Sequence, residues 1–328
     1  MAVAGDARAL FSLVRKGIDV RNVHAHVRKP FRFVLAGDPS LVASLRAILL
    51  SGYEGAVPPD VAACIETLQS GSPLLADKRE LRAAIFVGQR GDAASVDMTS
   101  LTALGVPVLA LTIDPDAASS GPSSAPERGT WSEYVEPALT AAALRGRFFV
   151  HLVNCSHGVE IAVGRNLPVL RETVAAKLTR DAAQNALKVS LASAVVDHIP
   201  VVGFVLGAVA SAGDMVAITG IQVMLLLHIE AVYGRDPDLG RAWQLLPIIG
   251  GGLGWRTLAR ELVGFVPIAG IAIKGAIAYA GTIVVGEGVT FFQQNGEHMT
   301  KGQAAKLYER AKGDAMRVAR DFVAKFRR

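Results

Sequence analysis

Two long apolar stretches constrain the fold of this chain more than any other feature of its 328 residues. The first, Ile199–Ile229, contains one charged residue, Asp214, near its middle. The second, Leu262–Val285, also has one charge in its interior, Lys274. Each stretch opens with a proline that is followed three residues later by a glycine: Pro200 and Gly203 in the first, Pro267 and Gly270 in the second. This similarity predicts an all-α region built from paired apolar helical hairpins.

The two lone charges, Asp214 and Lys274, have two interpretations. An ionisable side chain inside a membrane normally faces a partner, a cavity or a proton path, so the two residues would form an ion pair or a relay. Alternatively, one helix ends at Gly213 and Asp214 caps the next, and this is the interpretation that we favour. The cap leaves pieces of about 15 residues, which are too short to cross a hydrocarbon core of ~30 Å upright. The sequence therefore leaves open whether these segments span a membrane or form the buried core of a soluble bundle.

Small residues recur at every fourth position of both stretches, as they do in helices whose backbones approach closely. The series comprises Gly203, Gly207 and Ser211 in the first stretch, and Ala278 and Thr282 after Gly270 and Lys274 in the second. We predict that the two stretches pack through these faces. The alternative is that small residues are simply common in this composition.

The overall composition is apolar, and the basic charge lies at the two ends. Hydrophobic residues make up 51% of the chain and charged residues 19%, where soluble proteins usually have about 25% charged residues. The net charge is +5, with seven Lys/Arg against two Asp/Glu in residues 1–32 and nine against four in residues 296–328. Basic ends around apolar segments predict a lipid-membrane partner and two cytoplasmic termini. Neither end combines its charge with aromatic residues or a known motif, which argues against nucleic-acid binding.

The first half of the chain has the pattern of an α/β domain. After a basic arm over residues 1–30, short β-rich runs alternate with helical segments, which predicts a small parallel sheet over 31–145. The predicted strands are Phe31–Ala36, Leu81–Val87 and Val106–Ile113, and the predicted helices are Leu41–Leu50, Val61–Gln69 and Met98–Leu104. Residues 115–130 form a Ser- and Pro-rich loop. From Tyr134 onward the pattern is helical, so we place a second, all-α domain over 146–328, with a basic amphipathic helix over 301–328.

The turn after the first predicted strand lies where a P-loop protein carries its phosphate cradle. Gly37, Asp38 and Ser40 occupy this turn, but the second glycine and the lysine of G-x-x-x-x-G-K-[ST] are missing. Asp114 ends the third predicted strand, at the place of the aspartate in the Asn-Lys-x-Asp guanine motif, and the lysine of that motif is also missing. These four residues form at most a vestigial nucleotide site, and an ordinary α/β turn is the alternative. No cofactor is predicted, although a helix start of this kind can hold an anion weakly.

No other cluster predicts catalysis or metal binding. His151, Cys155 and His157 have metal-ligand chemistry, but they lack a fourth ligand at a defined spacing. The two cysteines, Cys64 and Cys155, predict no disulfide framework. Serine, histidine and carboxylate residues are scattered without a nucleophile elbow. We therefore predict no catalytic residues and no metal site.

The residues of the first apolar stretch and its continuation resemble a known bacterial family. The pattern comprises Pro200, Asp214, Ile221-Gln222-Val223-Met224, His228-Ile229 and Tyr233-Gly234. It is similar to the YcjF-like family, also called domain of unknown function 697, and the segment after Arg260 resembles the second hydrophobic half of that family. The similarity covers roughly residues 160–295, and this chain has a longer gap between Pro200 and Asp214. The resemblance implies a bacterial inner-membrane protein, multi-pass or peripheral, without a known reaction.

Many members of that family carry an Era-like GTPase domain ahead of this region. The resemblance therefore implies that residues 31–145 are a degenerate copy of a P-loop GTPase domain. On this basis we expect a non-enzymatic, membrane-associated scaffold, sensor or partner-binding protein, which could also self-associate. The alternatives are a divergent GTP-binding protein or GTPase, and a soluble helical module that binds a hydrophobic ligand or a partner helix.

Overall fold

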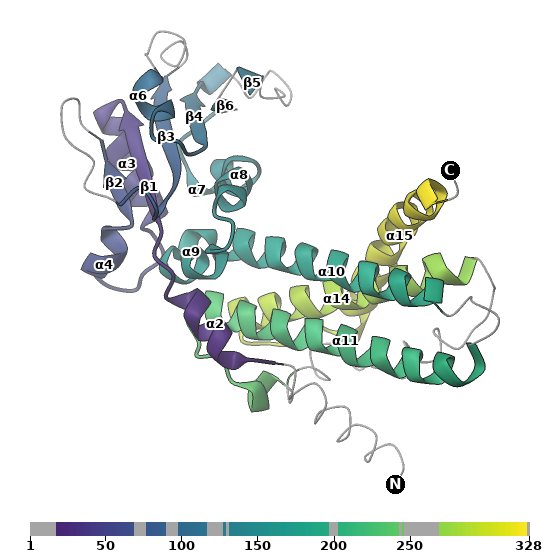
Figure 1. Cartoon of the computed structure of the whole chain (residues 1–328). Coiled ribbons are helices and arrows are strands. Elements are labelled where there is room, and N and C mark those ends of the chain that lie inside the picture. Colours follow the sequence, from purple (N-terminus) through teal and green to yellow (C-terminus); the bar gives the residue numbers. More distant parts are fainter. Residues whose placement is uncertain are drawn as a thin grey trace. The chain divides into compact units, whose positions relative to one another are not determined.

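The computed structural model describes residues 18–68, 77–89, 98–116, 127–128, 131–196, 203–242, 245 and 269–326. They belong to two compact units (Figure 1). The first unit is Ala25–Val174, and the second contains the described residues before Ala25 and those from Ala175 onward. The predicted boundary near residue 145 falls inside the first unit, and residues 1–17 of the predicted basic arm lie outside the described residues.

A parallel sheet forms the centre of the first unit, as the alternating pattern predicted. Its strands follow the order β2-β1-β3-β4-β6-β5, and all neighbours are parallel except β5 and β6. The strand bounds are β1 Arg32–Gly37, β2 Ile65–Thr67, β3 Leu81–Gln89, β4 Val108–Ile113, β5 Glu127–Arg128 and β6 Trp131–Glu136. The central strand β3 is buried from Ala83 to Val87, because a parallel sheet is covered on both faces and its strands become continuously apolar.

Three predictions for this unit were wrong. Residues 127–128, inside the predicted 115–130 loop, form the short strand β5 that pairs with β6. The predicted helix Val61–Gln69 ends after one turn, and the chain then pairs with β1 as the short edge strand β2. The segment before Glu136 is the strand β6 and not the start of the helical region. Its sequence alternates, with Tyr134 and Glu136 buried and Val135 half-buried, and this period of two is typical of a strand with one face on a core.

Helices cover the sheet and continue beyond residue 145. They are α3 Pro39–Leu49, α4 Pro59–Ala62, α6 Thr99–Thr102, α7 Ala141–Arg145, α8 Phe148–Cys155 and α9 Glu160–Asn166. Helix α8 packs on the sheet through Phe148, whose ring lies 5.9 Å from that of Tyr134. Helix α9 is tied to the same unit because the Tyr53 hydroxyl donates a hydrogen bond to the carbonyl of Asn166 over 2.6 Å.

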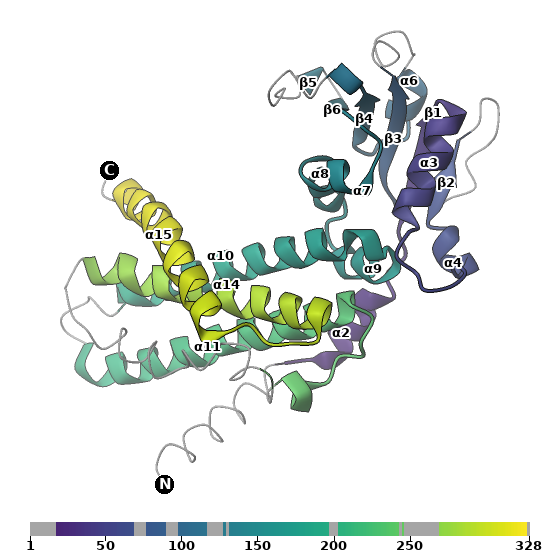
Figure 2. The same cartoon turned by 180° about the vertical axis from the view of Figure 1, so that it is seen from behind.

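The second unit is helical, as predicted. It contains most of α10 (Arg171–Val196), together with α11 (Gly203–Val232), α14 (Ala269–Asn295) and α15 (Lys301–Phe326). Helices α10, α11 and α14 lie side by side in both views (Figures 1 and 2). Helix α2 (Val20–Val27) lies near the start of the described residues. The predicted tail helix over 301–328 corresponds to α15.

Helix α11 does not break at Gly213, so the predicted cap at Asp214 was wrong. It continues from Gly203 to Val232, which is about 45 Å at 1.5 Å per residue. A glycine inside a helix costs only about 1 kcal/mol relative to alanine. The cooperativity of one long helix outweighs the local preference of Asp for a helix start.

Helices α11 and α14 run in the same direction. The Gln222 Nε2 donates to Thr282 Oγ1 over 3.3 Å, and the Gln294 Nε2 donates to the Tyr233 hydroxyl over 3.1 Å. Both helices therefore advance by a similar number of residues between these two contacts. The same register places Asp214 and Lys274 at one level along the two axes.

Helix α10 runs antiparallel to α14, and glycines allow the two to approach. A Cβ on Gly275 would lie 2.7 Å from Leu187 Cδ1, and a Cβ on Gly286 would lie 2.2 Å from Thr179 Oγ1. The predicted small-residue series therefore accounts for only part of the close contact between these helices. Thr282 meets α11, while Gly275 and Gly286, which are outside that series, meet α10. Any contacts of Gly203, Gly207 and Ser211 lie outside the described parts of the structure.

Candidate functional site

The carboxyl edge of the sheet contains the predicted nucleotide residues. The parallel strands, numbered along the chain, have the order 2-1-3-4-5, in which ligands of doubly wound proteins bind at the carboxyl ends of the first and third strands. Gly37 and Asp38 end β1, and Asp114 follows β4. With β3 between them, these strand ends lie roughly 10 Å apart. The structure therefore brings the predicted residues to one edge.

Asp38 satisfies the start of α3 with its own carboxylate. Its Oδ1 accepts hydrogen bonds from the backbone N–H of Ser40 at 2.9 Å and of Leu41 at 3.0 Å, and from the Ser40 hydroxyl at 2.6 Å. The Ser40 hydroxyl and these two amides hold the pKa of Asp38 below its usual value. In a phosphate cradle, amides of this kind point at the ligand. Here the side chain of Asp38 takes that place.

Gly37 makes the same turn tight. Its φ is 122°, and a Cβ at this position would lie 2.0 Å from the carbonyl oxygen of Val87 on β3. The amide of Asp38 donates to that same carbonyl over 3.0 Å. The backbone between β1 and α3 therefore contacts β3 closely, at the carboxyl ends of these two strands.

The described residues at the ends of β4 and β6 add carboxylates to this edge. The backbone amide of Asp116 donates to Asp114 Oδ1 over 3.1 Å, and the buried Glu136 ends β6 beside it in the sheet. Burial raises the pKa of Glu136, and the guanidinium of Arg147, with Nε 3.7 Å from Oε1, opposes that rise. The carboxylates of Asp38 and Asp114, which share this edge, disfavour the approach of a nucleotide phosphate, whereas Arg147 offsets the charge of Glu136.

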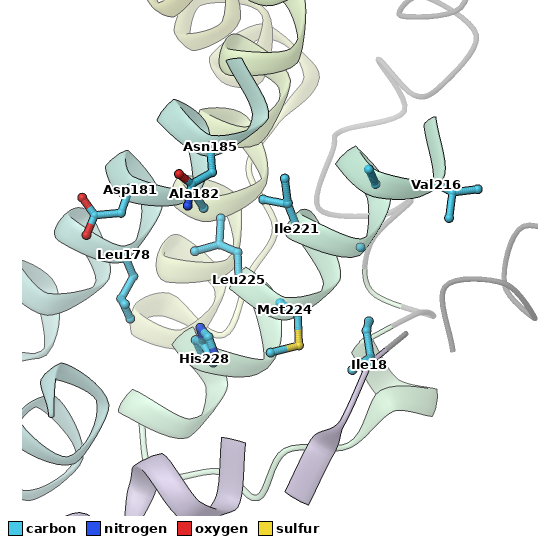
Figure 3. Close-up of a pocket in the computed structure, with 12 residues that line it drawn as sticks. Ile18, Leu178, Asp181, Ala182, Asn185, Val216, Ile221, Met224, Leu225 and His228 are labelled. Atoms are coloured by element: carbon cyan, nitrogen blue, oxygen red, sulfur yellow. The ribbon is translucent and has the colours of Figure 1, made fainter. Parts of the chain in front are cut away.

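A second site is an apolar groove between α10 and α11 in the helical unit. It has a volume of about 550 Å³ and is partly open, which is within the 300–1,000 Å³ of ligand pockets. Figure 3 shows Leu225 of α11 lying between the two helices, Ile221 at the level of Asn185 of α10, and Met224 on the side of Ile18. Leu178, Ile221 and Met224 are only half-buried, so apolar side-chain surface remains accessible within the groove.

Three polar residues accompany these apolar walls. Asp181 and Asn185 come from α10, and His228 comes from α11 (Figure 3). The carboxylate of Asp181 accepts a hydrogen bond from Lys177 Nζ over 2.6 Å, one turn earlier on the same helix. The positive charge of Lys177 offsets the negative charge of Asp181, so this pair adds no net charge to the rim of the groove.

A buried ion pair lies at the end of α11. The side chain of Glu230 has no exposed surface, and its Oε1 lies 3.1 Å from Arg241 Nε. Burial raises the pKa of Glu230, against the opposing effect of Arg241 and then of Arg235. Gly234, with φ of 87°, closes the helix: its amide donates to Ala231 and that of Arg235 donates to Glu230. These are the two bonds of a Schellman motif.

The predicted packing residues therefore have separate roles. Gln222 and Tyr233 join α11 to α14, and Gly234 ends α11. Pro200 and Pro267 lie outside the described residues, as do the side chains of Asp214 and Lys274 and any contact of Gly270. Within the described parts of the chain, no group of three or more His, Cys, Asp or Glu residues is placed to hold a metal ion.

Sequence reasoning missed the α10 wall of the groove. Leu178, Asp181, Ala182 and Asn185 have the i, i+3, i+4, i+7 spacing of one helix face, and this spacing could have indicated it. On α11, Met224 and His228 were noted only as part of the family pattern. Family models, curated proteins and solved structures were compared with the chain, and none of them matches it.

Proposed function

We propose that this chain is a non-enzymatic binding protein, whose helical unit receives an apolar ligand or partner in the α10–α11 groove. The observation that carries this proposal is the groove itself, where half-buried aliphatic side chains line a volume of about 550 Å³ beside three polar residues. Pockets with mostly apolar walls and a few polar groups are the usual form of a binding site.

The groove can be filled without disturbing the fold. Gly220 lines it, and a Cβ at this position would meet no atom within 4 Å. Replacing Gly220 with leucine should occupy the groove and, because leucine favours helices more than glycine, stabilise α11 by up to about 1 kcal/mol. We expect Gly220→Leu to weaken binding of the neutral apolar dye N-phenyl-1-naphthylamine at least tenfold, measured by fluorescence titration.

The matched control is Gly313→Leu in α15. Gly313 is exposed, and a Cβ there also meets no atom within 4 Å. This variant gains the same helix propensity but leaves the groove empty, so its dye affinity should equal that of the unchanged protein. Equal dye affinity in Gly220→Leu and Gly313→Leu would refute binding in the groove.

For the α/β unit, we propose a degenerate GTPase-like domain that does not use nucleotide. The support is the carboxylate of Asp38, which accepts the hydrogen bonds that a phosphate would accept. The divergent GTPase remains the alternative function, because the strand order and the position of Asp114 still match a nucleotide-type sheet. Titration of the full chain with GTP and Mg²⁺ tests it, and micromolar binding would overturn the proposal.

A pair of variants tests the role of Asp38. Asp38→Ala should lower the midpoint of urea unfolding at pH 7, because two amides lose their acceptor, whereas Asp38→Asn retains a side-chain oxygen without the charge and should recover only part of that loss. Since the folded pKa of Asp38 is lowered, its contribution to stability is present above the unfolded pKa of 3.8 and is lost as the pH falls through the folded value. The gap between wild type and Asp38→Ala should therefore narrow in acid. A gap that is unchanged at low pH would contradict this explanation.

We also propose that the helical unit associates with the bacterial inner membrane. The supporting observation is Gly275–Asn295 of α14, which is long and apolar enough to cross a bilayer, with a mean hydropathy of 1.4. However, 72% of its most apolar window is buried, as in the core of a soluble bundle. Cell fractionation with a carbonate wash distinguishes these cases: we expect the chain in the membrane pellet, and complete recovery in the supernatant would exclude insertion.

A further inference from the structure

Helix α15 has one buried side and one charged side. Ala304, Ala311 and Ala315 are buried, and at about 100° per residue they lie within roughly 40° of one another around the helix axis. The helix contacts α14 and crosses it in both views (Figures 1 and 2). This chain therefore already covers the alanine side, and the opposite side of α15 is open to a partner.

Three basic side chains, which we call the basic row, lie on that opposite side. Lys306, Arg310 and Arg317 are exposed, and they too lie within roughly 40° of one another, about 140° away from the alanines. The basic row is about 17 Å long at ~1.5 Å per residue. Glu309 and Asp314 flank it, one on each side, and Asp314 pairs with Arg317. Over its whole length α15 contains seven Lys/Arg against three Asp/Glu, so it attracts polyanions.

The flanking carboxylates restrict the kind of polyanion that fits. A helix in the major groove of DNA, which is about 12 Å wide, has phosphates on both sides, and there Glu309 and Asp314 would be repelled. A lipid headgroup layer is flat and contacts only the basic row. Tyr308 adds no base-stacking ring to the row, because it is half-buried and its ring centre lies 5.7 Å from Lys312 Nζ. Basic clusters on an amphipathic helix are typical of binding to anionic lipids.

We propose that the basic row of α15 binds the anionic headgroups of a membrane surface, such as those of phosphatidylglycerol. The inference rests on the proposed membrane association, and it adds the surface that makes the contact and the charge class of the lipid. Because the alanine side is turned to α14, α15 contributes charge to this contact and no apolar insertion. The contact should therefore weaken in salt, which shortens the range of the attraction.

The experiment is flotation of the purified full chain with two kinds of vesicle, one of phosphatidylcholine alone and one in which about a third of the lipid is phosphatidylglycerol. At about 0.1 M salt we expect at least tenfold tighter binding to the anionic vesicles, and at about 1 M salt no preference. One basic residue near such a surface strengthens binding about fivefold. Replacing Lys306, Arg310 and Arg317 together with glutamine should therefore weaken binding to the anionic vesicles at least tenfold and leave binding to the neutral vesicles unchanged.

The matched control replaces three exposed basic residues of the α/β unit, Lys78, Arg79 and Arg145, with glutamine. Arg145 forms an exposed pair with Glu172 over 2.9 Å, so each triple variant loses three positive charges and one surface ion pair. The control should keep the preference for anionic vesicles. Circular dichroism should show the same helix content in both variants, because glutamine favours helices nearly as much as lysine and arginine do.

The outcomes separate this inference from the proposed function. Equal losses of binding in the two triple variants would mean that net charge and not the basic row determines the contact, and the inference would be overturned. Equal binding to the two kinds of vesicle, or none to either, would also overturn it, while the carbonate wash decides separately on membrane association. If the chain binds a duplex DNA fragment more tightly than anionic vesicles, and the basic-row variant loses that binding, the surface recognises nucleic acid and the inference is wrong.

Discussion

Replacing Arg241 with glutamine is expected to lower the free energy of unfolding by roughly 3 kcal/mol at pH 7, the lower end of the range for breaking a buried ion pair. The loss comes from Glu230, whose side chain has no exposed surface and whose carboxylate lies 3.1 Å from Arg241. Without that guanidinium, the charged carboxylate stays buried, and only Arg235 still opposes the rise in its pKa. We take the lower end because the Arg241 side chain is itself 39% exposed.

The loss should depend on pH in a defined direction. Burial already raises the folded pKa of Glu230 above its unfolded value of 4.5. Such a group favours the folded state most below its unfolded pKa, and that contribution is lost as the pH rises through the folded pKa. Removing Arg241 raises the folded pKa further, so the deficit of Arg241→Gln should be larger at pH 8 than at pH 5. Urea unfolding at both pH values measures it.

Two controls isolate the buried charge. Adding Glu230→Gln to Arg241→Gln removes the unpaired carboxylate, and the double variant should recover part of the lost stability at pH 8. Arg317→Gln breaks an exposed pair with Asp314 and should cost under about 1 kcal/mol. A deficit in Arg241→Gln that is equal at pH 5 and pH 8 would contradict the buried-charge explanation.

The second large effect is expected from Gly37→Ala, which should cost roughly 4 kcal/mol of folding stability. Two terms add: backbone strain at a φ of 122°, about 1–3 kcal/mol, and overpacking of about 1–3 kcal/mol. The overpacking arises because the new Cβ would lie 2.0 Å from the carbonyl oxygen of Val87. That oxygen belongs to the backbone of β3, at the centre of the sheet, and cannot rotate away as a side chain would.

Gly105→Ala is the matched control for this prediction. Gly105 also has a positive φ, 73°, but no atom lies within 4 Å of its missing Cβ. It therefore measures strain without a collision, about 1 kcal/mol. Chemical denaturation of both variants compares the two terms. Similar losses at Gly37 and Gly105 would mean that the close approach to Val87 contributes nothing.

The class of each half of the chain could be read from the sequence because its signals are local. The apolar runs at Phe33–Leu35 and Leu81–Val87 predict buried parallel strands, and these strands form the centre of the sheet. β2 was missed because it is three residues long and becomes a strand only by pairing with β1. β6 was missed because its alternation was outweighed by the helical pattern that follows it.

The candidate sites, too, could be predicted only in part from the sequence. Gly37, Asp38 and Asp114 could be placed at the carboxyl edge, since strand ends of a parallel sheet share one edge. That Asp38 uses its own carboxylate to satisfy α3 required the hydrogen-bond distances. The groove depends on which faces of α10 and α11 meet across a long separation in sequence, and the apolar composition of Ile199–Ile229 does not contain that information. The preference for a cap at Asp214 failed for the opposite reason, because a local rule was outweighed by the cooperativity of one long helix.

The parallel direction of α11 and α14 has an electrostatic consequence. Antiparallel neighbours cancel their helix dipoles and parallel neighbours add them, so the C-terminal ends of α11 and α14 reinforce each other's partial negative charge, and the antiparallel α10 offsets part of it. Arg235 follows the end of α11 directly, and its guanidinium lies 5.9 Å from the ring of Phe292 near the end of α14. The positive charge of Arg235 therefore lies near the C-terminal ends of both helices. Because Arg235 also opposes the rise in the pKa of Glu230, its charge acts on the ends of both helices and on a buried carboxylate of α11.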